Sequence, residues 1–588
     1  MDKKNTIIGS LLIVAAFACY FISARYAPTP TSPAAIRQAV ASQAAPAGPA
    51  PFAAPQEETA FAAVAADHAG STITRLRNEF IEVRFTNFGG AIRDVALRKY
   101  PADLGRPDPF IFNEQHKDPM LAFVGLPGLD RGTRFQLVAQ SADGVTFRAV
   151  LPNGVEVIRR YTLSPDASGA TDPYEIRYET TFRNQGDHAT DPIRVLLALG
   201  TAPTSPVDRG LYLTTGYSTG SKQVFTRRAQ LEPSGGILGM GVHGPVPDIE
   251  AAGPLKWSSV SNQFFASILT PDDAAAGMTS RRVKLLSLLP DTDNNAYGIT
   301  GDAAFDIGSI APRGQVALSG SLYVGPKEYH RLANQDVFKA DQYKVMQYGG
   351  VFISFFSGLL ITLMTWTHSF VPNWGMAIIC TTLILKIVFL PLTMVSARSA
   401  RRMQKIQPEL TALREKFKDN PQKQQAATME LFKQHKVNPM GGCLPMLITL
   451  PFFIGFYSML RSTAELRFAS FLWIHDLSAP DTVGHVLGYP INLLPILFTA
   501  TSFFQMQLMP QPTVDNSQAK MMKFMPLITL FIYYTFSCSL SLYSTTNGLF
   551  MIGQQLVMNR GQDVGDPADK AKAKGGKPMR NVTPGKRK

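Results

Sequence analysis

The stretch WGMAIICTTLILKIVFLPLTM, from Trp374 to Met394, decides the fold class of this chain. As a helix, its roughly 21 mostly apolar residues would rise about 30 Å, the thickness of a bilayer's hydrocarbon core. Lys386 is the one charged residue in it. An intramembrane lysine costs about 2.5 to 3.5 kcal/mol, so it must reach the headgroups, pair, or face a polar cavity. Lys386 lies about 12 Å from Met394, beyond easy reach of the interface, and is therefore a candidate functional residue.

The composition favours a membrane protein with basic loops over a soluble enzyme. The 588 residues have a net charge of +13, and 17% of them are charged. The positive charge gathers at 398–436 and 570–588, and such clusters mark the cytoplasmic side of spanning segments. No disulfide framework or cysteine metal site is expected in the polar middle region, because it contains no cysteine. The cysteines all fall in apolar segments and are Cys19, Cys380, Cys443 and Cys538.

The first segment, residues 1–26, combines two lysines with an apolar run from Ile7 to Ser23. This pattern fits either a cleaved signal peptide or an uncleaved signal anchor. The run is long enough to span, and the Ala-Phe-Ala sequence at 16–18 lies inside it rather than after it, so we favour a transmembrane anchor. A lipoprotein reading of Cys19 fits less well, because the residues before it match a lipid-attachment box poorly.

A flexible linker and an all-β domain are predicted to follow. Residues 27–66 are rich in Ala and Pro and poor in large apolar side chains, so they cannot bury enough surface to fold. Within residues 67–340, Ile81, Val83 and Phe85 alternate with polar residues, as in a half-buried strand. The pattern recurs without long helical periodicity and predicts a β-sandwich of roughly 250 residues outside the cytoplasm.

The clearest hairpin signal is Asn153-Gly154, which separates the alternating stretches 145–151 and 155–163. A large sandwich could also bind or modify carbohydrate, with histidines and carboxylates as its site. Their spacing supports no particular constellation, and isolated histidines are more often structural or solvated. The histidines concerned are His68, His116, His188, His243 and His330.

Two apolar segments, Tyr348–Phe370 and the Lys386 stretch, are separated by only a tight turn. If both crossed the membrane, the basic loop that follows would lie outside, against the positive-inside rule. We therefore expect residues 341–373 to form an interfacial amphipathic helix on the outer side. Residues 374–560 then form a core of five spans, and the anchor makes six, with both termini inside.

Residues 395–441 carry mixed charge and an apolar stripe at helical spacing, which is broken at Asp419-Asn420-Pro421. This pattern predicts a cytoplasmic helical hairpin, and a solvated charged loop is the alternative. Later spans are expected at Gly442–Leu460, Ile491–Leu508, Met521–Phe536 and Leu540–Met558. Methionines cluster at the inner ends of the spans, which suits varied apolar partners but also ordinary membrane packing.

Hydroxyl and amide side chains recur within the later spans. Such groups can simply join helices, through hydrogen bonds worth about 0.6 kcal/mol on average. However, no acidic residue lies well inside any span to neutralise Lys386. We therefore infer a hydrated intramembrane groove that binds substrate. Its candidate residues are Lys386, Thr449, Thr499, Gln505 and Asn547.

The sequence Asn438-Pro439-Met440-Gly441-Gly442-Cys443-Leu444-Pro445, with Leu450-Pro451 after it, closely resembles the YidC family of membrane protein insertases and its oxidase-assembly and Albino relatives. Further motifs of the family occur in the expected order. They are Trp374-Gly375, Pro391-Leu392-Thr393, Trp473-Ile474-His475-Asp476-Leu477-Ser478 and Phe524-Met525-Pro526. The resemblance is dense over 348–560, and the anchor and β-rich domain resemble the Gram-negative form more loosely.

The resemblance implies a polytopic α-helical membrane protein with six transmembrane helices, five of them forming the insertase core. It also implies a large periplasmic all-β domain, a β-supersandwich. Lys386 stands where the family carries a positive groove residue, usually arginine, and lysine lacks the planar fork of donors. A second departure is Phe536-Ser537-Cys538-Ser539-Leu540, where relatives often have proline and glycine, so the geometry between the last two spans is open.

By the same resemblance, the protein would be no enzyme and would need no cofactor or metal. It would insert and help fold nascent membrane proteins in the bacterial inner membrane, alone or with the Sec translocon, with ribosomes and lipids as further partners. Substrate helices would leave along an apolar face comprising Leu450, Phe453, Phe498, Ile528 and Ile532.

The basic tail, residues 561–588, would hold ribosomes through RNA phosphates or lie near anionic lipid, and a plain solvated tail is the alternative. Its basic residues are Lys570, Lys572, Lys574, Lys577, Arg580, Lys586, Arg587 and Lys588.

Two other classes of function compete with insertion. A solute or ion transporter would use Lys386 as its coupling charge, but transporters usually show internal repeats, and this sequence has none that we detect. A membrane-anchored sugar-binding or sugar-modifying sandwich would need the β-rich domain for its activity. For an insertase, we expect large parts of that domain to be dispensable.

Overall fold

The computed structural model describes residues 62–63, 67–105, 107–124, 128–164, 171–204, 210–237, 240–286, 293–418, 420–435, 444–486, 489–508 and 516–560. These fall in two compact units. The β unit contains the described residues up to 362 together with 454–468. The helical unit contains 363–453 and 469–560. The predicted anchor, most of the predicted linker and the basic tail lie outside the described residues.

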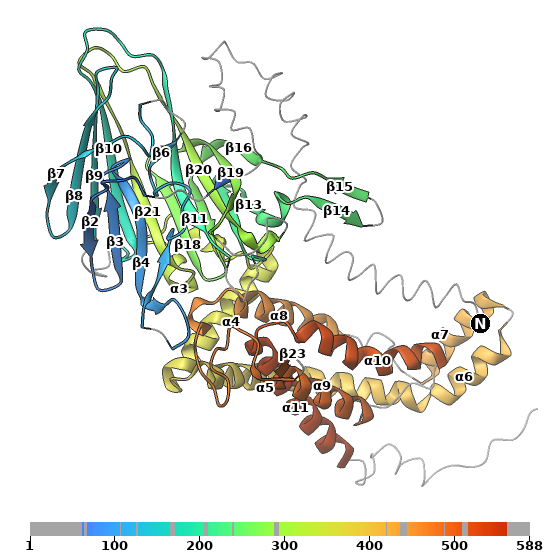
Figure 1. The fold of residues 1–588 in the computed structure, drawn as a ribbon. Coiled ribbons are helices and arrows are strands. Elements are labelled where there is room, and N and C mark those ends of the chain that lie inside the picture. The colour runs from blue at the N-terminus through green and yellow to red at the C-terminus, as the bar shows by residue number, and fades with distance from the viewer. Residues whose placement is uncertain are drawn as a thin grey trace, which may run out of the picture. The chain divides into compact units, whose positions relative to one another are not determined.

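The β unit is built on a nine-stranded antiparallel sheet (Figure 1). Its strands, in spatial order, are β13 (Gln223–Arg227), β12 (Thr214–Ser218), β17 (Trp257–Ser261), β18 (Phe265–Pro271), β21 (Gln315–Pro326), β10 (Glu175–Asn184), β9 (Val155–Leu163), β8 (Gly144–Val150) and β7 (Gln136–Gln140). The largest buried side chains of the unit include Trp257, Tyr161 and Tyr178 from these strands.

A second sheet follows the order β1 (Ala62–Ala63), β19 (Ala275–Lys284), β20 (Tyr297–Gly308), β11 (Ile193–Ala202) and β6 (Phe123–Val124), with β16 (Asp248–Leu255) also paired to β19. A third contains β2 (Ile73–Arg77), β3 (Ile81–Thr86), β4 (Ala91–Pro101) and β5 (Pro109–Phe112). Separate two-stranded ribbons are β14 (Ser234–Ile237) with β15 (Met240–His243), and β22 (Thr482–Val486) with β23 (Tyr489–Asn492) in the helical unit.

The local sequence patterns of the β unit are confirmed. Ile81, Val83 and Phe85 are fully buried on β3, as their alternation with polar residues predicts. The strands β8 and β9 pair as the predicted hairpin, with Ala149 opposite Val157. Gly154 in the turn has φ +77°, a conformation that glycine adopts without steric cost.

Short helices interrupt and follow the strands of the β unit. They are η1 (Arg228–Gln230), η2 (Asn294–Ala296), α3 (Tyr329–Leu332), η3 (Gln342–Met346) and, after α8, η5 (Ala464–Leu466). Glu328 before α3 and Glu465 in η5 both belong to this unit. Arg331 of α3 donates to Glu328 over 2.8 Å and to Asp172 over 2.7 Å, which ties α3 to the start of β10.

Long helices follow η3 in the described chain. They are α4 (Val351–Phe370), α5 (Trp374–Lys405), α6 (Gln407–Lys416), α7 (Pro421–Gln434), α8 (Leu444–Leu460), α9 (Leu493–Leu508), α10 (Asn516–Tyr533) and α11 (Cys538–Arg560). The break predicted at 419–421 separates α6 from α7, where Pro421 is the first helical residue and Asn420 caps the helix by accepting from the Lys423 N–H.

Within the described residues, Val351–Phe370 and Trp374–Val395 are long and apolar enough to cross a membrane. Leu450–Leu460 and Leu493–Leu508 are shorter apolar helices. The helix α5 continues beyond the predicted end of its span at Met394 as far as Lys405. In the helical unit, α11 packs against both α5 and α9, and α10 packs against α9. Two helices, α5 and α9, therefore pack on α11, and α10 packs on the outside of α9.

Candidate functional site

The helices α5 and α11 start from the same loop, residues 469–481. Before α5, Asn373 Nδ2 donates to the carbonyl of Ser470 over 3.0 Å. At the start of α11, the Cys538 N–H donates to the carbonyl of Ala479 over 2.8 Å. Because the two helices begin at one loop and pack against each other along their length, they run in the same direction.

A hydrogen bond further along fixes their register. Gln554 Nε2 on α11 donates to Thr393 Oγ1 on α5 over 3.2 Å. Seven residues are nearly two full turns, so the residues seven positions earlier lie on the same faces, about 10.5 Å back along each helix. Those residues are Asn547 on α11 and Lys386 on α5. The register therefore places Asn547 at the level of Lys386, on the side of α11 that faces α5.

The helix α8 closes a third side of this site. Its Phe452 ring meets the Phe389 ring of α5 edge-on, with centroids 4.8 Å apart. Its Phe453 ring lies 6.3 Å from the Tyr543 ring of α11. Phe389 follows Lys386 by three residues, and Tyr543 precedes the asparagine by four. The two ring pairs therefore lie one turn to either side of the lysine level.

The polar groups between the ring pairs are unmatched. Lys386 is half-buried and has no ion pair or hydrogen bond with any described side chain or carbonyl. The Asn547 Oδ1 atom is buried and likewise has no hydrogen-bond partner in the described part of the chain. An ammonium group has three donors and an amide oxygen is an acceptor, so the site holds complementary, unused hydrogen-bonding capacity.

The other predicted groove residues differ in their availability. The buried Thr499 hydroxyl donates to the Pro495 carbonyl of its own helix over 2.8 Å. Gln505 is half-buried on α9, one turn beyond Thr501, which lies against Gly548 of α11. Thr449 lies on α8, but its side chain is outside the described set. The helix register thus places Lys386 and Asn547 at one level, and Thr499 is bonded to its own backbone.

Sequence reasoning counted Gln554 among the polar residues of the spans, but it did not single out Gln554, Thr393 or Tyr543 as site residues. The Gln554–Thr393 hydrogen bond sets the register of α5 and α11, and the Tyr543 ring contacts Phe453 of α8 on the side of the site nearer the helix starts. Spacing could have pointed to two of them, because Thr393 and Gln554 each follow a predicted site residue by seven positions.

The predicted apolar face is largely exposed. Leu450 and Phe453 on α8, and Ile528 and Ile532 on α10, have exposed fractions between 38% and 51%. Phe498 is half-buried instead, with its ring centroid 4.7 Å from that of Tyr533. Large exposed apolar side chains are expected where a helix faces lipid or another apolar segment.

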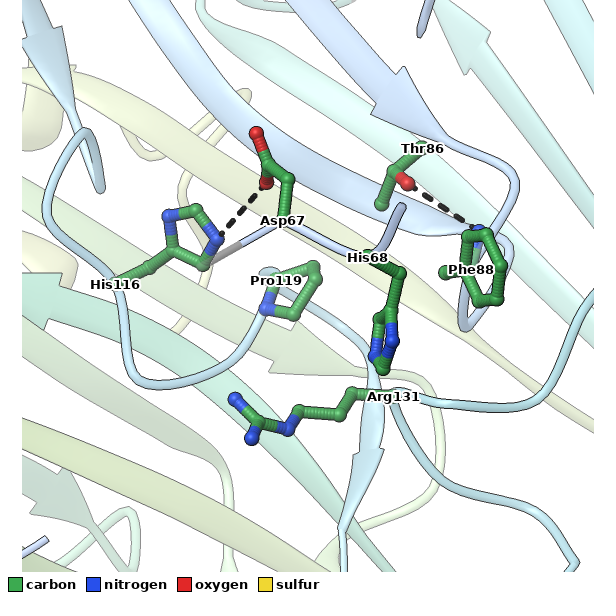
Figure 2. A pocket seen from close by; sticks show the side chains of 7 residues that line it. All are labelled: Asp67, His68, Thr86, Phe88, His116, Pro119 and Arg131. Carbon is green, nitrogen blue, oxygen red and sulfur yellow. Dashed lines mark hydrogen bonds and ion pairs between the residues drawn. The ribbon is translucent and has the colours of Figure 1, made fainter. Parts of the chain in front are cut away.

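The β unit contains a small pocket lined by two of the histidines considered for carbohydrate binding, His68 and His116 (Figure 2). His116 Nε2 lies 3.6 Å from Asp67 Oδ1, and the His68 ring stacks on Phe88 with centroids 4.6 Å apart. The space open to water in this pocket is about 20 Å³, roughly that of one water molecule. In the described ranges, no three or more His, Cys, Asp or Glu side chains are grouped so that they could hold a metal ion.

Comparison with known proteins decides the family. Residues 74–363 match the family model of the YidC periplasmic domain, and residues 366–565 match that of the 60Kd inner membrane protein. The membrane protein insertase YidC of Methylobacillus flagellatus is 30% identical over 95% of this chain and 97% of its own length. The chain belongs to the YidC family of membrane protein insertases.

Other YidC proteins match over shorter spans. The insertase of Polynucleobacter asymbioticus is 33% identical over 61% of this chain, and the match spans 57% of that relative. Among solved structures, an active YidC insertase with its first transmembrane domain resolved is 18% identical over 84% of this chain, with a TM-score of 0.32. The two family models assign residues 74–363 to a periplasmic domain and residues 366–565 to an inner membrane protein.

Proposed function

We propose that this protein inserts nascent membrane proteins into the bacterial inner membrane and helps them fold. The single observation that carries the mechanism is the unpaired Lys386, half-buried between α5, α8 and α11, with the open acceptor of Asn547 at its level. An isolated charge in an apolar helical unit is costly unless something offsets that cost, and a passing substrate can do so.

Lys386 would act on the part of a client that is hardest to move. A client's short extracytoplasmic tail carries polar and acidic groups that lose hydration in lipid. A positive, hydrated resting place partway across would lower that barrier. The process involves no covalent step, so binding energy and lateral exit into lipid carry it.

The client's apolar segment would leave along the exposed side chains of α8 and α10. Leu450, Phe453, Ile528 and Ile532 present apolar surface that a substrate helix or lipid can cover. Phe498 would support this face from beneath, through its contact with Tyr533. Because lipid covers the same surface equally well, exit needs no further energy source.

The finer topology belongs to this proposal. The protein would cross the membrane six times, with both termini in the cytoplasm, and α4 would lie at the outer interface. The charge argument supports this position for α4, although its 20 residues are long enough to span. The basic tail would hold the ribosome, and Sec components and anionic lipids would be further partners.

Reconstitution separates insertion from transport. Purified protein in lipid vesicles should protect a newly made single-span client from added protease, and protein-free vesicles should not. The same vesicles should show no substrate-dependent current or solute flux. Flux without client protection would favour a transporter with Lys386 as its coupling charge and would contradict the proposal.

A further inference from the structure

We propose that Asn547 positions the Lys386 ammonium group while leaving its positive charge available to acidic clients. This inference rests on the proposed function, since it assigns a source of client selectivity to the same groove. It concerns a positioning residue, because Asn547 would act on clients through Lys386.

The register of α5 and α11 is the first observation that supports this role of Asn547. The Gln554–Thr393 hydrogen bond and the seven-residue spacing place the two side chains at one level of two packed, parallel helices. Packed helices are separated by about 8 to 10 Å, a distance that a four-carbon lysine stem and a short amide can bridge between them. The Asn547 Oδ1 atom is buried and has no other acceptor duty among the described residues.

The two aromatic ring pairs that flank the level of Lys386 are the second observation. The Phe389–Phe452 pair lies one turn toward the far ends of α5 and α11, and the Phe453–Tyr543 pair lies one turn toward their starts. These rings restrict where a flexible lysine side chain can go. An acceptor between them therefore selects one orientation of the ammonium group.

The third consideration is that the Asn547 amide is neutral. A hydrogen bond from a charged donor to a neutral acceptor is stronger than one between two neutral groups, and it does not cancel the charge. A carboxylate at the same place would form an ion pair and neutralise the lysine. An asparagine thus holds the ammonium group and keeps its field for the client's acidic residues.

The test uses the full-length protein in vesicles and two matched single-span clients. Their extracytoplasmic tails differ only in carrying two aspartates or two asparagines. We expect Asn547→Asp to lower the ratio of acidic-tail to neutral-tail insertion by about tenfold, because the new carboxylate pairs with Lys386 and repels the acidic tail. The matched control is Gly553→Asp, which adds the same charge to α11 at an exposed position with open space around it and should change the ratio less than about twofold.

Two variants guard against misfolding. Asn547→Leu removes the acceptor without adding charge and should lower acidic-tail insertion more than neutral-tail insertion. Asn547→Gln keeps the amide and should restore the wild-type ratio. Insertion of the neutral-tail client and the thermal unfolding midpoint in detergent show that each variant is folded; if Asn547→Asp is not, Asn547→Leu decides.

The outcomes distinguish this inference from the proposed function. If the wild-type protein inserts neither client, the proposed function fails. If it inserts both but Asn547→Asp and Asn547→Leu keep the wild-type ratio while Lys386→Ala does not, the role of Asn547 is overturned. Equal effects of Asn547→Asp and Gly553→Asp would also overturn it, since any added carboxylate on α11 would then suffice.

Discussion

Arg331 in the β unit and Lys386 in the helical unit are both partly buried cations, and their surroundings are opposite. Arg331 donates to Glu328 and Asp172 and lies 4.8 Å from the centre of the Tyr174 ring. Lys386 contacts no acidic partner within the described residues. The hydrogen-bond donors of Arg331 are used within the protein, so this cation stabilises the fold. The donors of Lys386 are unused among the described residues, so this cation is available to a ligand.

Removing Arg331 should have the largest effect on stability. Arg331→Met leaves Asp172 and Glu328 as partly buried, uncompensated carboxylates, and breaking such a pair costs about 3 kcal/mol or more. The thermal unfolding midpoint in detergent should fall, while insertion below that temperature should persist. The matched control is Arg313→Met, which breaks an exposed pair with Asp187 and should cost less than about 1 kcal/mol. Equal shifts for the two variants would show that the Arg331 cluster is not structural.

Glu465, also in the β unit, is a buried acidic residue whose hydrogen-bonding capacity is only partly used among the described residues. Burial and the charge of Glu328 raise its pKa from 4.5 to about 8, although Arg331 acts in the other direction. Its Oε2 atom has no hydrogen-bond partner in the described chain. The folded protein therefore keeps this proton between about pH 4.5 and 8, whereas the unfolded chain loses it, so stability falls as pH rises through that window.

Glu465→Gln should remove this pH dependence. The variant should match the wild type near pH 4.5 and be more stable than it by about 2 kcal/mol at pH 6 and about 4 kcal/mol at pH 8, since one pKa unit corresponds to about 1.4 kcal/mol. The measurement is the difference in unfolding free energy between the two proteins at several pH values. A difference that does not change with pH would contradict the assignment of Glu465 as neutral in the folded state.

The smallest effect is expected at Thr499. Its hydroxyl donates to its own helix, so Thr499→Val removes no contact across the groove. Insertion should change less than about threefold, the equivalent of about 0.6 kcal/mol for an average side-chain hydrogen bond in a membrane protein. A tenfold loss would place Thr499 in the groove beside Lys386 and would blur the distinction between used and unused polar groups.

The sequence was sufficient for features set by neighbouring residues. Alternation and an Asn-Gly turn predicted the β8–β9 hairpin, and Asn420-Pro421 predicted the start of α7. It also singled out Lys386 and Asn547, because charge and amides are rare inside apolar helices.

Sequence reasoning could not find contacts between distant residues. Asp172 and Arg331 are 159 positions apart, and Gln554 lies 161 positions from Thr393. Which hydroxyls remain available also depends on packing, since a threonine can donate to its own helix, as Thr499 does. The folded structure was therefore needed to find which distant residues contact each other, whereas the residue types at the site could be predicted from the sequence.

The central claim is that the unpaired charge of Lys386 is the active feature of the groove. The most direct measurement is insertion of a small single-span client with an acidic N-terminal tail into vesicles, comparing the wild type with Lys386→Ala and Lys386→Arg. We expect the Lys386→Ala protein to lose insertion of this client and the Lys386→Arg protein to retain it. Equal insertion by all three proteins would show that apolar helix faces suffice, and it would contradict the claim for that client.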